Sequence, residues 1–304
     1  MPVPASSASL RTPSDHQHQT GTAVQPRLPS PSFRTQCFEH ADRWFHRLAN
    51  LAEALHKGFW LGSLSADDLN AITAKRYGAS QHLASTEHVE SGFFDWEAPL
   101  LERYFRKESR ILVAAAGSGR EILALRDAGF SADGFECNPS LLAAGKKIFE
   151  QLGQSHSVVF CEADMVPSGP QIYDGLIVGW SAYTHIPTRL RRVRFLQALR
   201  GRTLPQSPLV MSFFIRNESS RYSALTYRAG AICRILFRGR KEPLERGDDL
   251  EFSHFRHRFT RDEIEAELQA GGFRMLDYSE QGDAGIAAAI ADDALLQRPI
   301  TKTV

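Results

Sequence analysis

Short apolar runs alternate with amphipathic segments along the second half of the chain. Five runs have the length of buried strands, and three segments between them carry apolar residues at helical spacing. The strands are predicted at 111–116, 131–137, 157–164, 173–180 and 207–216, and the helices at 120–129, 138–153 and 187–202. Apolar strands that alternate with helices predict the α/β class, with a mostly parallel sheet covered by helices on both faces.

The pattern changes after the fifth strand. Residues 216–258 form an insert rich in arginine and aromatic residues. A helix is then predicted at 259–272, with Thr260 as its N-cap and Glu263 completing a capping box. Two last strands, at 273–280 and 285–292, are joined by the short turn QGDA, which favours an antiparallel hairpin.

The first third of the chain has a different composition. Residues 1–34 are rich in Pro, Ser, Thr and Gln and predict a disordered tail. Residues 35–106 predict a helical N-terminal extension or lid, with expected N-caps at Ser65 and Asp95 and a helix end at Gly78. The α/β domain is therefore expected at 107–304, with its insert at 216–258.

Composition limits the class of protein. The chain has 304 residues and a net charge of +1, so it has room for a sizeable domain and no overall attraction to nucleic acid or anionic membrane. Its four cysteines form no C-x-x-C pair, which argues against a zinc ribbon and fits a reducing compartment. No apolar run approaches the roughly 20 residues of a membrane-spanning helix. We expect a soluble cytoplasmic protein.

A glycine turn follows the first predicted strand, in ILVAAAGSGREILAL at 111–125. Gly117 and Gly119 allow the backbone to approach a ligand where a side chain would clash. The turn lies at the carboxyl end of a strand, where open α/β sheets bind ligands. Glu136 ends the second strand, where a carboxylate can accept hydrogen bonds from both hydroxyls of a ribose. Together these features predict a nucleotide-binding edge.

This order of motifs, with Asp164 ending the third strand and a final hairpin, resembles the class I S-adenosylmethionine (SAM) dependent methyltransferases over about 105–292. The resemblance implies a Rossmann-like sheet of seven strands in the order 3-2-1-4-5-7-6, with the last strand antiparallel, and SAM as cofactor. It also implies the ligand contacts: Ala115, Gly117 and Gly119 on the methionine part, Glu136 on the ribose, Asn138 beside the ribose or adenine, Asp164 and Met165 on the adenine, and Trp180 and Ser181 facing the sulfonium and the acceptor.

Two positions depart from the family pattern. Val113 stands where the first strand usually carries an acid, and Ala115 replaces the first glycine of the turn. The methionine ammonium then needs another partner, through water or from Asp95 or Glu97. An NAD(P) site is the main rival, but the final glycine of its G-x-G-x-x-G motif would fall at Ile122.

The segment GWSAYTHIP, residues 179–187, follows the fourth strand and would border the methyl acceptor. Tyr183 and His185 are the candidate catalytic residues, because either could orient or deprotonate an acceptor. The alternatives are packing for Tyr183 and a helix cap for His185. No N/D-P-P-Y/F/W motif is present, which argues against methylation of adenine amino groups or protein glutamine. Positioning and desolvation could also suffice without a base.

Further substrate contacts are expected from Tyr77 and His88 in the lid and from His257 in the insert. His254 and His257 are three residues apart, so on a strand they point to opposite faces and at most one reaches the acceptor. With no third ligand at matching spacing, no metal site is expected.

The predicted reaction is methyl transfer from SAM to an O or N atom of a small-molecule acceptor. Two alternatives stay open. Val113 in place of the usual acid supports a SAM-binding protein without transferase activity. The basic, aromatic insert supports an RNA or protein methyltransferase, although the charge balance makes nucleic acid an unexpected partner. The sequence does not predict an oligomeric state.

Overall fold

The computed structural model describes residues 32–236 and 242–296, and its centre is a seven-stranded sheet. Five strands are parallel: β1 (Arg110–Ala114), β2 (Ser131–Glu136), β3 (Val158–Phe160), β4 (Gly175–Val178) and β5 (Pro208–Phe214). The closing hairpin of β8 (Phe273–Gln281) and β9 (Ala284–Ala291) places β9 antiparallel beside β5. The observed order β3-β2-β1-β4-β5-β9-β8 confirms the predicted topology, because β8 and β9 are the sixth and seventh strands of this sheet.

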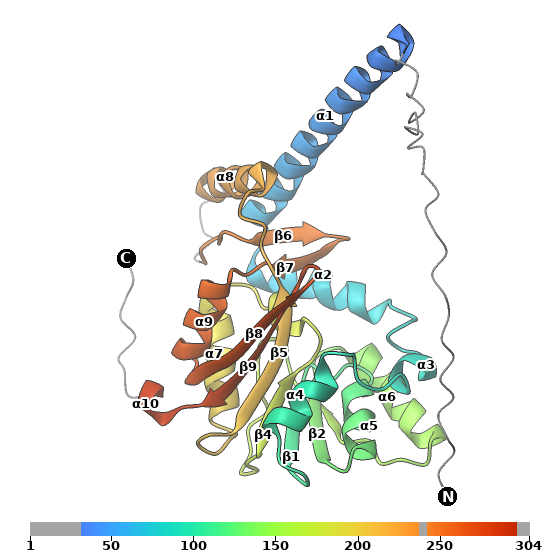
Figure 1. Cartoon of the computed structure of the whole chain (residues 1–304), viewed down its shortest axis with the longest axis vertical. Coiled ribbons are helices and arrows are strands. Elements are labelled where there is room, and N and C mark those ends of the chain that lie inside the picture. The colour runs from blue at the N-terminus through green and yellow to red at the C-terminus, as the bar shows by residue number, and fades with distance from the viewer. Residues whose placement is uncertain (1–31, 237–241, 297–304) are drawn as a thin grey trace, which may run out of the picture. The chain divides into compact units, whose positions relative to one another are not determined.

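Helices cover both faces of the sheet (Figure 1). One face holds α4 (Glu97–Tyr104), α5 (Arg120–Asp127) and α6 (Pro139–Gln151), and the other holds α7 (Arg189–Arg200) and α9 (Arg261–Ala270). Alternation along β1 separates the two cores: Ile111 and Val113 enter the first, Leu112 and Ala114 the second. The parallel strands are thus buried on both sides, which explains their unbroken apolar character.

Between residue 32 and the sheet, the described chain forms four helices: α1 (Phe33–Ser63), α2 (Ala66–Gly78), α3 (Thr86–Val89) and α4. Ser65 and Asp68 form a capping box at α2, so the predicted cap and the end at Gly78 are confirmed. The predicted cap at Asp95 is wrong, since the N-cap of α4 is Trp96 without a side-chain bond. The Glu97 carboxylate instead accepts the backbone N–H of Phe94 (2.7 Å). The expected disordered tail lies, up to residue 31, outside the described residues.

The insert folds as α8 (Arg221–Leu236) and a two-stranded hairpin of β6 (Asp248–Glu251) and β7 (His254–His257). Helix α8 packs on the last turns of α1 through glycine: a β-carbon at Gly58 would lie 2.6 Å from the carbonyl oxygen of Thr226. The Thr260–Glu263 capping box then starts α9, as predicted. The remaining elements of the described residues are short: η1 (Ala182–His185) and α10 (Asp293–Leu296). Within the described ranges, no helix is both long and apolar enough to cross a membrane.

Candidate functional site

A cavity of about 260 Å³ opens at the carboxyl ends of the parallel strands. The loops after β1, β2, β3 and β4 form its walls, and α2 and the segment around α3 complete them. All the residues predicted for the site line it, apart from Gly119, Ser181 and His257. Chain segments from the lid and from four strands thus converge on one place, as expected for a ligand site in an open α/β sheet.

Gly117 and Gly119 of the first turn are required for different structural reasons. Gly117 has φ +56°, and a β-carbon placed there would meet no atom within 4 Å, so this position opens onto the cavity. Gly119 has φ +99° and is the N-cap of α5. A β-carbon at Gly119 would lie 2.7 Å from the Phe149 ring. Gly119 is therefore required for the packing of α5 on α6 and not as a cavity wall.

The Glu136 carboxylate accepts hydrogen bonds from the turns after β1 and β2 and so links them. Its Oε2 accepts the N–H of Gly117 (2.8 Å), and its Oε1 accepts the N–H of Asn138 (2.7 Å). Asn138 caps α6 and donates from Nδ2 to the carbonyl of Ala74 in α2 (2.8 Å). The buried carboxylate keeps lone pairs free for a ligand, because each oxygen can accept two hydrogen bonds.

Asp164 lines the cavity but does not end the third strand as predicted, because β3 ends at Phe160 and Asp164 lies in the following turn, in the left-handed region with φ +63°. Its Oδ2 accepts from Nδ2 of Asn70 (2.7 Å) and from Nη1 of Arg191 (3.1 Å). Burial raises the pKa of the Asp164 carboxyl. Met165 beside it is exposed and lines the cavity. Asn70 and Arg191 carried no signal in the sequence, since each comes from a helix far away along the chain.

Tyr77 and His185 form a hydrogen-bonded pair in the cavity wall. The Tyr77 hydroxyl lies 2.7 Å from Nε2 of His185, and Nδ1 of His185 lies 2.7 Å from the carbonyl oxygen of Phe255. A carbonyl only accepts, so the network assigns the proton to Nδ1 and leaves Nε2 to accept from Tyr77. Burial lowers the pKa of His185 to about 4, so the ring is neutral at pH 7. The sequence predicted both residues, but not that they are partners.

Tyr183 has another partner. Its ring reaches the cavity wall, but its hydroxyl is fully buried and donates to Oε2 of Glu267 (2.7 Å). Ser181 is buried as well, and its N–H donates to Oγ of Ser212 (2.8 Å). The helix cap considered for His185 is wrong, because Thr188 caps α7. The hydroxyl that contacts His185 in the cavity wall is therefore that of Tyr77, and not that of Tyr183.

The aromatic end of the cavity is formed by Trp180 and Phe94, whose ring centroids lie 5.6 Å apart. Trp180 is 52% exposed although it follows a buried strand. His88 lines the same end, and its ring lies 4.9 Å from that of His82. Burial, with the nearby charge of Arg120, lowers the pKa of His88 to about 4. This end of the cavity is therefore aromatic, and His88 is neutral there at pH 7.

A buried charge cluster adjoins this aromatic end, because the Arg120 guanidinium lies over the Phe94 ring (3.8 Å). Arg120 binds both Glu97 (2.8 Å) and Glu121 (2.7 Å), and all three side chains are almost inaccessible. Of this cluster only Arg120 and Glu121 line the cavity, and neither Asp95 nor Glu97, the two carboxylates considered for the methionine ammonium, is among the lining residues. Burial raises the pKa of Glu121, and the carboxylate of Glu97 contributes to the increase. Two carboxyl groups therefore share one guanidinium at the cavity wall.

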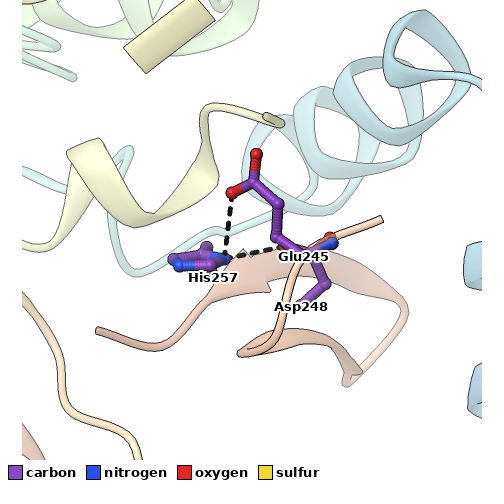
Figure 2. A group of neighbouring side chains, drawn as sticks. All are labelled: Glu245, Asp248 and His257. Atoms are coloured by element: carbon purple, nitrogen blue, oxygen red, sulfur yellow. Dashed lines mark hydrogen bonds and ion pairs between the residues drawn. The ribbon is translucent and has the colours of Figure 1, made fainter. Parts of the chain in front are cut away.

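His257 lies outside this cavity, in the cluster of Figure 2. Its Nδ1 lies 2.7 Å from Oδ1 of Asp248 and 3.9 Å from Oε2 of Glu245, an arrangement that could hold a metal ion. The ligand atoms are already engaged, however. Oε2 of Glu245 accepts from Arg192 (2.6 Å), and Oδ2 of Asp248 accepts the N–H of Glu245 (2.8 Å). With a guanidinium against one ligand oxygen, this is a hydrogen-bonded network and a poor cation site.

The histidine contact expected from His257 is made by His254, which lies on the opposite face of the same strand, β7. His254 is on the same strand, and its ring lies 5.3 Å from His185 and 5.7 Å from Tyr77. His254, and not the predicted His257, is thus the histidine of this strand that packs against the Tyr77–His185 pair. The opposite orientation of the two histidines follows from the two-residue period of a strand.

Known proteins share the architecture and little of the sequence. A SAM-dependent methyltransferase from Methanosarcina mazei has a TM-score of 0.53 and 17% identity, covering 66% of this chain and 99% of its own. The 1,6-didemethyltoxoflavin-N1-methyltransferase from Burkholderia thailandensis, solved with its acceptor and S-adenosylhomocysteine, has a TM-score of 0.52 and 14% identity, covering 76% and 92%. No protein-family model and no curated protein sequence matches the chain. The chain has the Rossmann-like fold seen in SAM-dependent methyltransferases.

Proposed function

We propose that the protein is a SAM-dependent methyltransferase that acts on an O or N atom of a small molecule. One observation supports this most: Gly117, Glu136 and Asp164 line a single cavity at the strand ends, on a sheet of the matching topology. Glu136 would hold the ribose, Asp164 and Met165 the adenine, and Ala115 and Gly117 the methionine part. SAM supplies an electrophilic methyl group carried by a sulfonium.

The acceptor would lie between Trp180, Phe94 and the Tyr77–His185 pair. The Tyr77 hydroxyl would contact the acceptor heteroatom, whose proton would pass to Tyr77 as the hydroxyl proton passes to Nε2 of His185. The backbone carbonyl of Phe255 keeps Nδ1 protonated, so Nε2 stays available as the accepting atom. Apolar walls and neutral histidines favour a small, uncharged, aromatic or apolar acceptor.

The insert gives less support to an RNA substrate. Several of its arginines are held by the protein: Arg216 pairs with Glu263, Arg256 with Glu251, and Arg234 donates to the carbonyl of Leu61. Arg238, Arg240 and Lys241 lie outside the described residues. Guanidinium groups committed to internal partners contribute little to phosphate binding. We therefore propose a small-molecule acceptor in the cytoplasm, a location supported by four unpaired cysteines.

Replacing Glu136 by alanine is expected to weaken the binding of SAM and of S-adenosylhomocysteine by about 1–3 kcal/mol, the scale for a lost hydrogen-bond partner. Titration calorimetry measures both affinities. Asp133→Ala is the matched control, because Asp133 is on the same strand but pairs with Arg110 away from the cavity. Unchanged affinity in Glu136→Ala would refute the ribose assignment. Failure of the wild type to bind either ligand would refute the methyltransferase, whereas binding without transfer to any acceptor would favour a SAM-binding protein.

Replacing Glu121 by glutamine removes any negative charge of this carboxyl group without changing the shape of the cluster. If this charge neutralises the methionine ammonium, SAM and S-adenosylhomocysteine should each lose about 1–3 kcal/mol of affinity. A deaminated S-adenosylhomocysteine should bind the variant and the wild type equally well. A loss confined to SAM would assign the charge to the sulfonium instead. An equal loss for the deaminated ligand would mean that Glu121 only shapes the cavity.

A further inference from the structure

Helix α1 carries an apolar stripe that repeats every seven residues. Successive spacings of three and four residues define two rows, and a third row runs beside them. The first row is Phe38, Phe45, Ala52 and Phe59, the second is Ala41, Leu48, Leu55 and Gly62, and the third is Cys37, Trp44, Leu51 and Gly58. A seven-residue apolar repeat with two or three rows is typical of a helix that packs against another helix along its length.

The large side chains of the stripe are exposed within the described residues. Phe38, Phe45, Leu48 and Leu55 are 68%, 66%, 60% and 47% exposed. Cover begins only at the last turns, where Gly58 and Gly62 meet α8. Single exposed apolar residues are ordinary, but a contiguous stripe of this kind marks an interaction surface.

We propose that α1 is the interface of a homodimer, in which its stripe packs against the same stripe of a second copy. The large side chains of the stripe are 40% to 68% exposed. With about 150–250 Å² for each large side chain, they would bury on the order of 700 Å² per copy. That is close to the ~800 Å² that each partner contributes to a standard interface. A two-fold axis lets one surface act as its own complement.

Two other partners for the α1 stripe, the chain's own N-terminal segment and a membrane surface, fit less well. The 31 residues before the described region contain no aromatic residue, so the chain's own N-terminal segment does not supply a matching stripe. A membrane surface would require a polar face rich in lysine and arginine. Helix α1 instead carries four basic and three acidic residues, which is close to neutral. A mixed-charge helix with a heptad stripe fits another protein helix better than anionic lipid.

The test compares the full-length wild type with Leu48→Glu, which places a charge in the middle of the stripe. The control is His46→Glu, which adds the same charge to the opposite side of the same helix. Light scattering on a sizing column should give twice 34.0 kDa for the wild type and for His46→Glu, and 34.0 kDa for Leu48→Glu. Because Leu48 is already exposed, circular dichroism and the melting of the monomeric fold should confirm that the variant folds.

A monomeric wild type at high concentration, or a dimeric Leu48→Glu, would overturn the proposal. A second experiment measures co-sedimentation of the protein with phosphatidylcholine–phosphatidylserine vesicles. Vesicle binding by a monomeric wild type that Leu48→Glu abolishes would assign the stripe to a membrane surface instead. None of these measurements uses SAM or an acceptor, so their outcome is independent of the proposed activity.

Discussion

Replacing Arg192 by leucine is expected to lower the free energy of unfolding by about 3–5 kcal/mol, the scale for removing one partner of a buried ion pair. Arg192 is 1% exposed and forms a two-pronged bond with Glu267 (2.8 Å and 3.0 Å), which is 2% exposed. It also binds Glu245 (2.6 Å) and lies over the Phe259 ring. Without the guanidinium, the buried carboxylate of Glu267 and the partly buried carboxylate of Glu245 both lose this opposite charge.

Urea unfolding followed by circular dichroism measures this loss. Arg194→Leu is the control: Arg194 is exposed on the same helix, so its change should stay within about 0.5 kcal/mol. The double variant Arg192→Leu with Glu267→Leu should recover part of the stability, because one stranded carboxylate is then gone. A loss in Arg192→Leu no larger than in Arg194→Leu would show that the buried pair contributes little.

Replacing Tyr77 by phenylalanine is expected to lower kcat by about 10²–10⁴-fold, the range for general acid–base catalysis, with SAM affinity unchanged. The ring stays in place and only the hydroxyl that donates to His185 is lost. Tyr183→Phe is the comparison, since its hydroxyl donates to Glu267 away from the reacting atoms. That variant should lose stability while kcat is retained. A wild-type kcat in Tyr77→Phe would mean that positioning alone drives transfer.

The pH dependence of the same reaction tests His185. Burial lowers its pKa to about 4, so the acid limb of kcat should lie near pH 4 and not near the usual histidine value of 6.5. On lowering the pH, the free energy of unfolding should decrease before kcat does. Between pH 6.5 and about 4 only the unfolded state binds this proton, so stability falls as the pH drops through that window. An acid limb near pH 6.5 would contradict a buried neutral histidine.

Local patterns predicted the features that depend on nearby residues. The capping boxes at Ser65 and Thr260 were correct because both partners lie within one turn. The prediction at Asp95 failed because Glu97 and the chain entering α4 decide which residue caps the helix. The placement of Tyr77 beside His185 joins residues 108 positions apart, so no periodicity could indicate it.

By itself, the sequence determined the alternation of strands and helices, the glycine turn and the acidic end of the second strand, because burial on both faces and backbone turns impose patterns on consecutive residues. The order of the strands came from the resemblance to a known family, and the third strand ends at Phe160, before Asp164. Only the tertiary structure decided that Glu121, and not Glu97, faces the cavity, that His254 supports the site while His257 joins Asp248, and that Asn70 and Arg191 hold Asp164. Those partners meet through packing between distant elements, and the chemistry of the site depends on which side of each helix or strand is turned inwards.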